Sequence, residues 1–135
     1  MKIHKCGTVS VAVLAMLALV QGCSSFSPGA GGGTGHSPVE YVGNSLRVSD
    51  NLPLNLVVDA ANVAVKKLLI TVAVDKKKSG IVRLEGQDAK QQPVIVQLVG
   101  INHYTTEVQI TVGTADSAEN RAEERQIYDE MRTGY

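Results

Sequence analysis

Aromatic side chains are scarce in this 135-residue sequence, which contains no Trp, one Phe and four Tyr. Proteins that bind single-stranded nucleic acid stack bases on aromatic rings, and readers of quaternary ammonium groups need an aromatic cage, so neither class is well supported. An excess of one charge is also missing, because 13 Lys and Arg balance 13 Asp and Glu. Binding to nucleic-acid phosphates requires a basic surface, so we expect no nucleic-acid partner.

The N-terminal apolar run is too short to be a comfortable membrane span. Residues 8–20 are uncharged and mostly apolar, whereas a spanning helix needs roughly 20 such residues. Lys2 and Lys5 place positive charge before the run. A positive start followed by an apolar run of roughly 7–15 residues is typical of a secretory signal peptide. The sequence therefore predicts a signal peptide over residues 1–22.

The end of this run, Leu19-Val20-Gln21-Gly22-Cys23, resembles a bacterial lipobox. An aliphatic residue stands three positions before the Cys and a small residue directly before it, although Gln21 departs from the commoner small or apolar choice. The resemblance implies cleavage between Gly22 and Cys23. It also implies that the Cys23 sulfur carries a diacyl group with fatty-acid chains such as palmitate, and that the new amino group is acylated too. An ordinary cleaved signal with an incidental Cys is the alternative.

Such a lipid anchor would fix the location of the protein. Acyl chains contribute about 0.8 kcal/mol per buried CH₂, so three chains would hold it stably at a membrane. Ser24 stands where lipoproteins of the inner membrane commonly carry Asp, so we expect the outer membrane of the cell envelope, facing the periplasm. Cys6 leaves with the signal peptide, so the mature chain forms no internal disulfide. With Cys23 acylated and His36 outside the folded domain, we expect no metal and no cofactor beyond the covalent lipid.

Glycine dominates the next segment, where five of residues 24–37 are Gly. Such a segment cannot bury enough apolar surface to offset chain entropy, so we expect a flexible tether. A phosphate-binding loop at residues 31–35 is excluded, because no strand precedes them and no Lys follows. The predicted organisation is a signal peptide (1–22), the lipidated Cys and tether (23–37) and a single domain (38–135).

The domain shows the periodicities of a mixed fold. Alternating apolar residues predict strands at residues 40–48, 70–75, 82–85, 94–99 and 106–112, separated in the last four by turns at 76–80, 86–92 and 100–103. Helical spacing predicts helices over 54–68 and 118–132. Residues 49–51 are candidate caps of the first helix, and Asp116 or Ser117 of the second. The thin apolar stripe of the second helix predicts packing by its C-terminal half only.

The expected fold class is therefore α+β with two layers: an antiparallel sheet of about five strands, in the order β-α-β-β-β-β-α, with two helices on one face. This order also resembles the topology of the TATA-binding protein, an analogy of fold that carries no function.

Several features together resemble a family of small bacterial lipoproteins that carry a domain of unknown function. They are the lipobox, the Gly-rich tether, the element order, an Ala-rich first helix after a strand with Tyr and Val, a Gly-Ile-Val strand start at residues 80–82, and a last strand that ends at Val112-Gly113 before an acidic helix cap. The resemblance covers most of the mature chain and implies an envelope lipoprotein.

No catalytic constellation is visible in the domain. His103 lies in a predicted turn, and the sequence 43–47 lacks the second Gly of a G-x-S-x-G nucleophile elbow. The acidic residues of the last helix stand three or four positions from Arg, which favours ordinary intrahelical pairs. We therefore expect no enzyme.

The remaining candidate site is the sheet face that the helices leave uncovered. Its predicted residues are Tyr41, Arg47, Arg83, Glu85, Ile95, Gln97, Val99, Glu107 and Gln109. Ile95 and Val99 stand out as apolar among polar neighbours; they are either scattered surface residues or part of a docking surface. Lys76-Lys77-Lys78 is either a solvated hairpin tip that discourages strand pairing or a contact for anionic lipid headgroups.

Three functional hypotheses follow. The favoured one is a non-enzymatic interaction or accessory module, anchored to the membrane, whose partner is an envelope protein. A module that binds a small ligand or lipid would need an enclosed apolar cavity. An enzyme acting on peptidoglycan or another glycan would need a cleft with two carboxylates.

Overall fold

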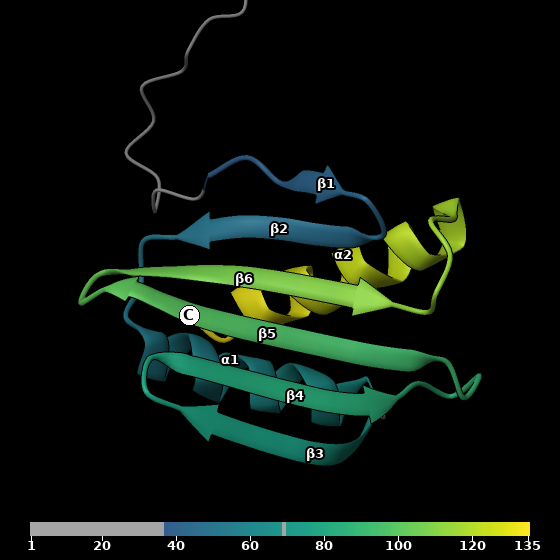
Figure 1. Ribbon diagram of the computed structural model, residues 1–135, viewed down its shortest axis with the longest axis horizontal. Helices are drawn as coiled ribbons and strands as arrows, with labels where there is room; N and C mark the ends of the chain where they lie inside the picture. The colour runs from purple at the N-terminus through teal and green to yellow at the C-terminus, as the bar shows by residue number, and fades with distance from the viewer. Residues whose placement is uncertain (1–36, 69) are drawn as a thin grey trace, which may run out of the picture. The chain divides into compact units, whose positions relative to one another are not determined.

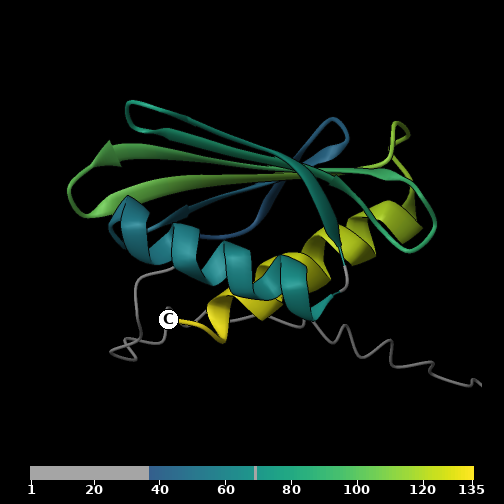
Figure 2. The same cartoon turned by 90° about the horizontal axis from the view of Figure 1, so that it is seen from below.

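The computed structural model describes residues 37–68 and 70–135, in which a six-stranded antiparallel sheet carries two helices on one face (Figures 1 and 2). This confirms the predicted two-layer α+β fold, with one strand more than expected. The strand order is β1-β2-β6-β5-β4-β3. The predicted signal peptide, lipobox and all but the last residue of the predicted tether lie outside the described residues. The elements are β1 (Glu40–Val42), β2 (Ser45–Asp50), α1 (Leu54–Lys67), β3 (Thr71–Lys78), β4 (Ile81–Gln87), β5 (Pro93–Asn102), β6 (Thr105–Val112) and α2 (Ala118–Arg132).

The additional strand arises from a tight turn inside residues 40–48, which the sequence predicts as one strand. Gly43 adopts a positive φ of 61°, and the Gly43-Asn44 pair joins β1 to β2 as a two-residue hairpin loop. Gly at the first of two central positions is the requirement of a type II′ turn. The prediction of a single strand is therefore wrong, although Gly-Asn is itself a hairpin signal.

Two further hairpins have longer arms and shorter turns than predicted. Lys76-Lys77-Lys78 belong to strand β3 and not to a turn, because Ser79 and Gly80 alone connect β3 to β4. Likewise β5 continues to Asn102, so that the next turn consists of His103 and Tyr104. Strand pairing thus includes polar residues that the sequence predicted to lie in turns.

A bulge interrupts the pairing of β3 with β4, where the register shifts between Val72 and Val74. Gly86 lies beside this shift, and a Cβ atom at this position would lie 2.2 Å from the carbonyl oxygen of Thr71. No side chain fits in that space. Gly86 is therefore required by the close approach of two backbones.

The core lies between the sheet and the two helices, as the edge-on view of Figure 2 shows. Every second residue of β5 and β6 points into it, which confirms the predicted alternation. Helix α1 buries Val57 and Val65 together with three alanines. Small side chains allow a helix to pack closely against its neighbours. The buried apolar side chains of the sheet are Leu46, Val48, Val82, Leu84, Val94, Val96, Leu98, Val108, Ile110 and Val112.

Helix α2 packs along its whole length and not by its C-terminal half alone, so that prediction is wrong. It begins at Ser117, whose Oγ accepts a hydrogen bond from the Asn120 backbone amide at 3.1 Å. The buried stripe is polar in its first half and apolar in its second, which is why hydrophobicity alone did not indicate it. Its members are Asn120, Glu124, Ile127, Tyr128 and Met131.

Asp50, predicted as a cap of the first helix, is instead a fully buried hydrogen-bond acceptor. Its carboxylate accepts bonds from the hydroxyls of Tyr128 at 2.6 Å and Tyr135 at 2.8 Å. Burial, together with the neighbouring Asp50, raises the pKa of both tyrosines above the usual range. Helix α1 meanwhile begins after Pro53 without a side-chain cap. These bonds join the end of β2 to α2 and to the last residue of the chain.

We expect Tyr128→Phe to lower the free energy of unfolding by about 1–3 kcal/mol, because it removes a hydrogen bond from a buried carboxylate. Urea denaturation of the variant and the wild-type protein measures the difference. Tyr104→Phe is the matched control, since Tyr104 is 78% exposed. Equal stability of the two variants would contradict the role assigned to the bond.

Candidate functional site

The helices leave the other face of the sheet uncovered, and the strand register aligns polar residues across it. Arg47 lies opposite Gln109, Gln109 opposite Gln97, and Gln97 opposite Arg83. The pairing continues outward at both sides, so that one line of residues crosses all six strands. We call it the polar row; its members are Glu40, Arg47, Gln109, Gln97, Arg83 and Lys76.

Hydrogen bonds and ion pairs connect one end of the polar row. The Arg83 guanidinium donates to Gln97 Oε1 at 3.2 Å and to Glu85 Oε1 at 2.5 Å. Lys76 Nζ lies 3.8 Å from the same Glu85 oxygen. Lys76 and Arg83 are like charges directly opposite each other, and the Glu85 carboxylate between them offsets their repulsion. At the other end, no hydrogen bond or ion pair involves the Arg47 side chain among the described residues, so this exposed cation is available to a binding partner.

The two predicted apolar residues of this face flank the polar row. Ile95 lies opposite Glu85 and Val99 lies opposite Glu107, and both side chains are half-buried among their longer polar neighbours. The sheet face therefore brings together every predicted residue except one. Its apolar area is interrupted by Gln97, so it is a mixed surface and not a continuous apolar patch.

Tyr41 is the exception, and its predicted place on the open face is wrong. The hairpin at residues 43–44 pairs Tyr41 with the buried Leu46, which puts both side chains on the helix side of the sheet. There the Tyr41 hydroxyl donates to the backbone oxygen of Arg121 at 3.3 Å. The Arg121 guanidinium lies 5.1 Å from the centre of the tyrosine ring, a cation–π geometry. Tyr41 thus fastens β1 to the start of α2.

Two open depressions border the polar row. One, of about 420 Å³, lies over β3, β4 and β5 and is lined in part by Arg83, Glu85 and Ile95. The other, of about 400 Å³, lies beside β1 and β2 and includes Glu40, Arg47 and Glu107. Its two carboxylates lie on β1 and β6, the neighbours of β2, and among the described residues neither forms an ion pair with Arg47.

His103 lies in the exposed β5–β6 turn, as predicted, with its ring centre 6.5 Å from that of Tyr104 in an edge-to-face geometry. No group of three His, Cys, Asp or Glu residues within residues 37–68 and 70–135 could hold a metal ion. In the same part of the chain, no helix is long and apolar enough to cross a membrane.

Helix α2 carries a buried carboxylate that hydrophobic patterning did not indicate. The predicted intrahelical pairs of the acidic residues in this helix are wrong for Glu124, whose side chain is 1% exposed. Glu124 Oε1 accepts a hydrogen bond from the Val112 amide at 3.1 Å, and Oε2 has no partner among the described residues. Burial raises the pKa of Glu124. The signal available in the sequence was its spacing with Asn120 and Ile127, which places all three on one helix face.

Glu124→Gln is expected to flatten the pH dependence of stability. A carboxyl group whose pKa is raised by folding favours the folded state below its unfolded pKa of about 4.3, and this contribution is lost as pH rises through the folded pKa. Gln cannot ionise and retains an oxygen for the Val112 amide, so the variant should gain stability relative to wild type as pH rises above the unfolded pKa. Urea denaturation at several pH values measures the slope.

Glu130→Gln is the control of opposite sign, because Lys67 lowers the pKa of Glu130. Its loss should reduce stability fully above the unfolded pKa, and this reduction should disappear as pH falls through the lowered folded pKa. A wild-type pH slope in Glu124→Gln would refute the assignment of a buried ionisable group there.

Comparison with known protein families gives a match over most of the chain. The family model described as "Protein of unknown function (DUF3568)" matches residues 8–129. No curated protein matches the chain. Because the match spans the described sheet and most of α2, as well as the apolar run before them, the chain belongs to the DUF3568 family of proteins of unknown function.

Proposed function

We propose that the protein is a lipid-anchored lipoprotein of the bacterial cell envelope, held in the outer membrane and facing the periplasm. The sequence at residues 19–23 carries this proposal, since it combines an apolar run, a small residue and Cys23 in the order that lipidation requires. The family match begins at residue 8 and so includes this segment. The anchor is the covalent lipid on Cys23, and no other cofactor is needed.

We further propose that the folded domain is a non-enzymatic interaction or accessory module that docks an envelope protein through its open sheet face. The observation behind this is the polar row, which spans all six strands with Ile95 and Val99 on either side. A surface with an available Arg, hydrogen-bonding amides and half-buried apolar side chains has the composition of a moderately polar interface. Such a face can be covered by a partner without rearrangement of the sheet.

The two alternatives have weaker support. Binding of a small ligand or lipid favours an enclosed apolar cavity, whereas both depressions on this face are open and partly charged. A glycan-cleaving enzyme could use Glu40 and Glu107, which line one depression. However, a general acid near neutral pH needs a carboxyl group in an apolar environment, and Glu40 is an exposed residue beside Arg47.

The anchor is tested by Cys23→Ala in cells fed a labelled fatty acid. The wild-type protein should incorporate label and be shortened to residues 23–135, whereas the variant should remain unlabelled and unprocessed because its acceptor sulfur is missing. Serine at the same position is a second control, since it preserves size and polarity. Processing of Cys23→Ala to the mature size would overturn the lipoprotein proposal.

The docking face is tested by site-specific photocrosslinking in living cells. A photoreactive residue at Gln97, in the centre of the open face, should yield a discrete adduct with one envelope protein. The same residue at Val63 is the matched control, because Val63 is 47% exposed but lies on α1, on the opposite side of the sheet.

The adduct at position 97 should be lost when Ile95→Lys and Val99→Lys are combined in a protein that still folds, and should persist in Val63→Lys. Equal adducts at positions 97 and 63 would indicate random collisions and contradict the proposed docking face. Absence of an adduct at position 97 would contradict it as well.

A further inference from the structure

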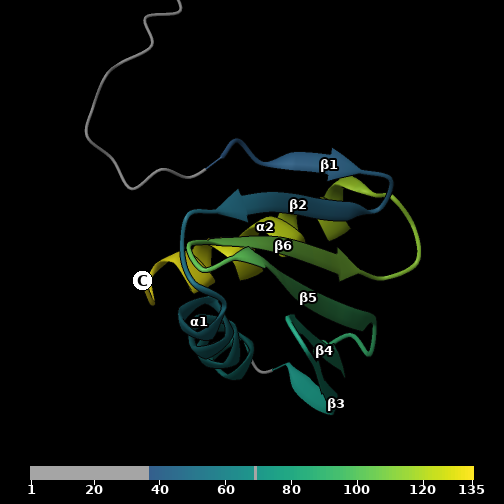
Figure 3. The same cartoon turned by 60° about the vertical axis from the view of Figure 1, so that its left-hand side comes forward.

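The described chain begins beside one particular end of the sheet. The Ser37 amide donates to the Ser49 backbone oxygen at 3.3 Å, close to the end of β2. Ser49 and Asp50 pair with the first residues of β6, which directly follow the His103-Tyr104 turn. The β3–β4 turn lies at the same end, because the Gly100 amide donates to the Gly80 oxygen at 2.8 Å. We call this region the hairpin end; it is on the left in Figure 1 and comes forward in Figure 3.

Apolar and basic side chains project together from the hairpin end. Tyr104 is 78% exposed and Ile101 is 57% exposed, the two largest values among the exposed large apolar side chains of the described residues. Lys78 is exposed and lies opposite the exposed Ile81, at the β3–β4 turn. We call these four residues the tip surface: Lys78, Ile81, Ile101 and Tyr104.

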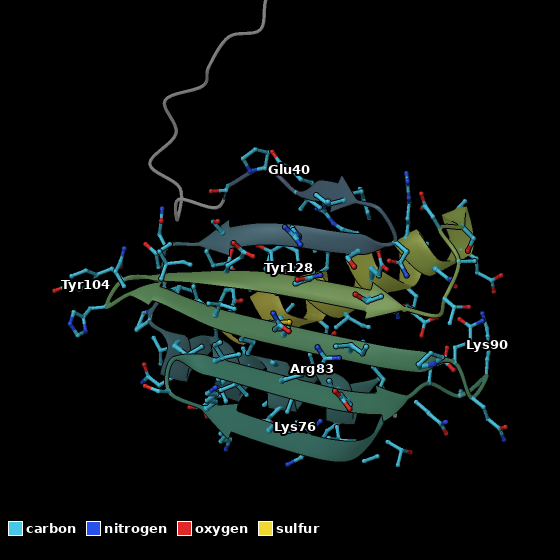
Figure 4. The ribbon with its side chains drawn as sticks, in the orientation of Figure 1. Glu40, Lys76, Arg83, Lys90, Tyr104 and Tyr128 are labelled. Atoms are coloured by element: carbon cyan, nitrogen blue, oxygen red, sulfur yellow. The ribbon has the colours of Figure 1, made fainter. Side chains whose placement is uncertain are left out.

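Acidic side chains gather at the other end of the sheet. Asp88 lies in the β4–β5 turn, and Asp116, Glu119 and Glu123 lie at the start of α2. Lys90 forms an ion pair with Glu119 there, and Figure 4 shows Lys90 and Tyr104 at opposite ends of the molecule. The far end therefore carries four carboxylates, two of which are paired with Lys90 and Arg121. Glu40 and Glu107 lie with Ser37 in the depression beside β1 and β2.

We propose that the tip surface contacts the anionic phospholipid headgroups of the membrane that carries the lipid anchor. This inference rests on the proposed anchor, because the lipid would be at Cys23 and the chain enters the domain at Ser37, beside the hairpin end. Tyr places its ring at the membrane–water interface, and each Lys near an anionic leaflet strengthens binding. The acidic end then faces away from the negatively charged surface, and the open sheet face remains accessible from the side.

The absence of Trp from the chain allows a direct experiment with full-length protein reconstituted in phospholipid vesicles. Tyr104→Trp, the tip probe, places a single indole fluorophore on the tip surface. Ala89→Trp, the far probe, places one in the β4–β5 turn at the other end. In vesicles rich in phosphatidylglycerol, the emission of the tip probe should shift to the blue and be quenched by brominated acyl chains. The emission of the far probe should show neither change.

The charge requirement has its own variant. A Lys near an anionic surface changes binding by about fivefold, so adding Lys78→Gln to the tip probe should reduce its quenching in vesicles rich in phosphatidylglycerol. Quenching of the tip probe should also be weak in purely zwitterionic vesicles. Equal quenching of the two probes, or quenching of the tip probe that is independent of phosphatidylglycerol, would overturn the proposal.

The mass of the reconstituted protein shows whether it is acylated, and this measurement allows the tip contact and the lipid anchor to be tested separately. Acylated protein whose tip probe is not quenched would overturn the tip contact and leave the anchor standing. Quenching of the tip probe in protein that carries no acyl group would support the tip contact and count against the anchor. Protein with neither property would refute both.

Discussion

Burial of one face of the sheet beneath α1 and α2 is the constraint on which the rest of the structure depends. Because side chains alternate along a strand, covering one face fixes which residues of every strand remain on the other. The polar row and its flanking apolar residues occupy positions that the core cannot use. The candidate site therefore consists of the strand residues that do not point into the core. A one-residue slip in the register of a strand would turn its core residues outward and its site residues inward.

The fold was predictable where a periodic pattern is long. The alternation of Val94, Val96 and Leu98 and the helical spacing of Val57, Ala61 and Val65 both indicate the observed elements. Turns and helix stripes were harder, because they depend on contacts distant in sequence. Three consecutive lysines looked like a loop, yet pairing with β4 keeps them in a strand. The buried face of helix α2 begins with Asn120 and Glu124. These polar side chains are held by hydrogen bonds and not by apolar contacts, so hydrophobicity does not mark this face.

The same distinction applies to the candidate site. Alternation alone placed Arg47, Gln97 and Gln109 on one face, as the structure confirms. The prediction for Tyr41 was wrong because a turn between Tyr41 and Arg47 reverses the chain. The alternation of side chains along one strand therefore does not extend from Arg47 back to Tyr41. The polar row itself could not be predicted, since the register that aligns it is set by turn lengths and by the bulge in β3. The proposed lipid anchor rests on the residue types at positions 19–23 alone.

The two hydroxyls that donate to Asp50 come from Tyr128 and Tyr135, which lie 78 and 85 residues further along the chain. Helix α1 and strands β3 to β6 stand between β2 and α2 in the sequence, so these bonds form only when the two ends of that long segment meet. A buried carboxylate that loses its donors is costly. The docking of α2 and the burial of the end of β2 are therefore mutually dependent, and the domain gains this stabilisation as one cooperative unit.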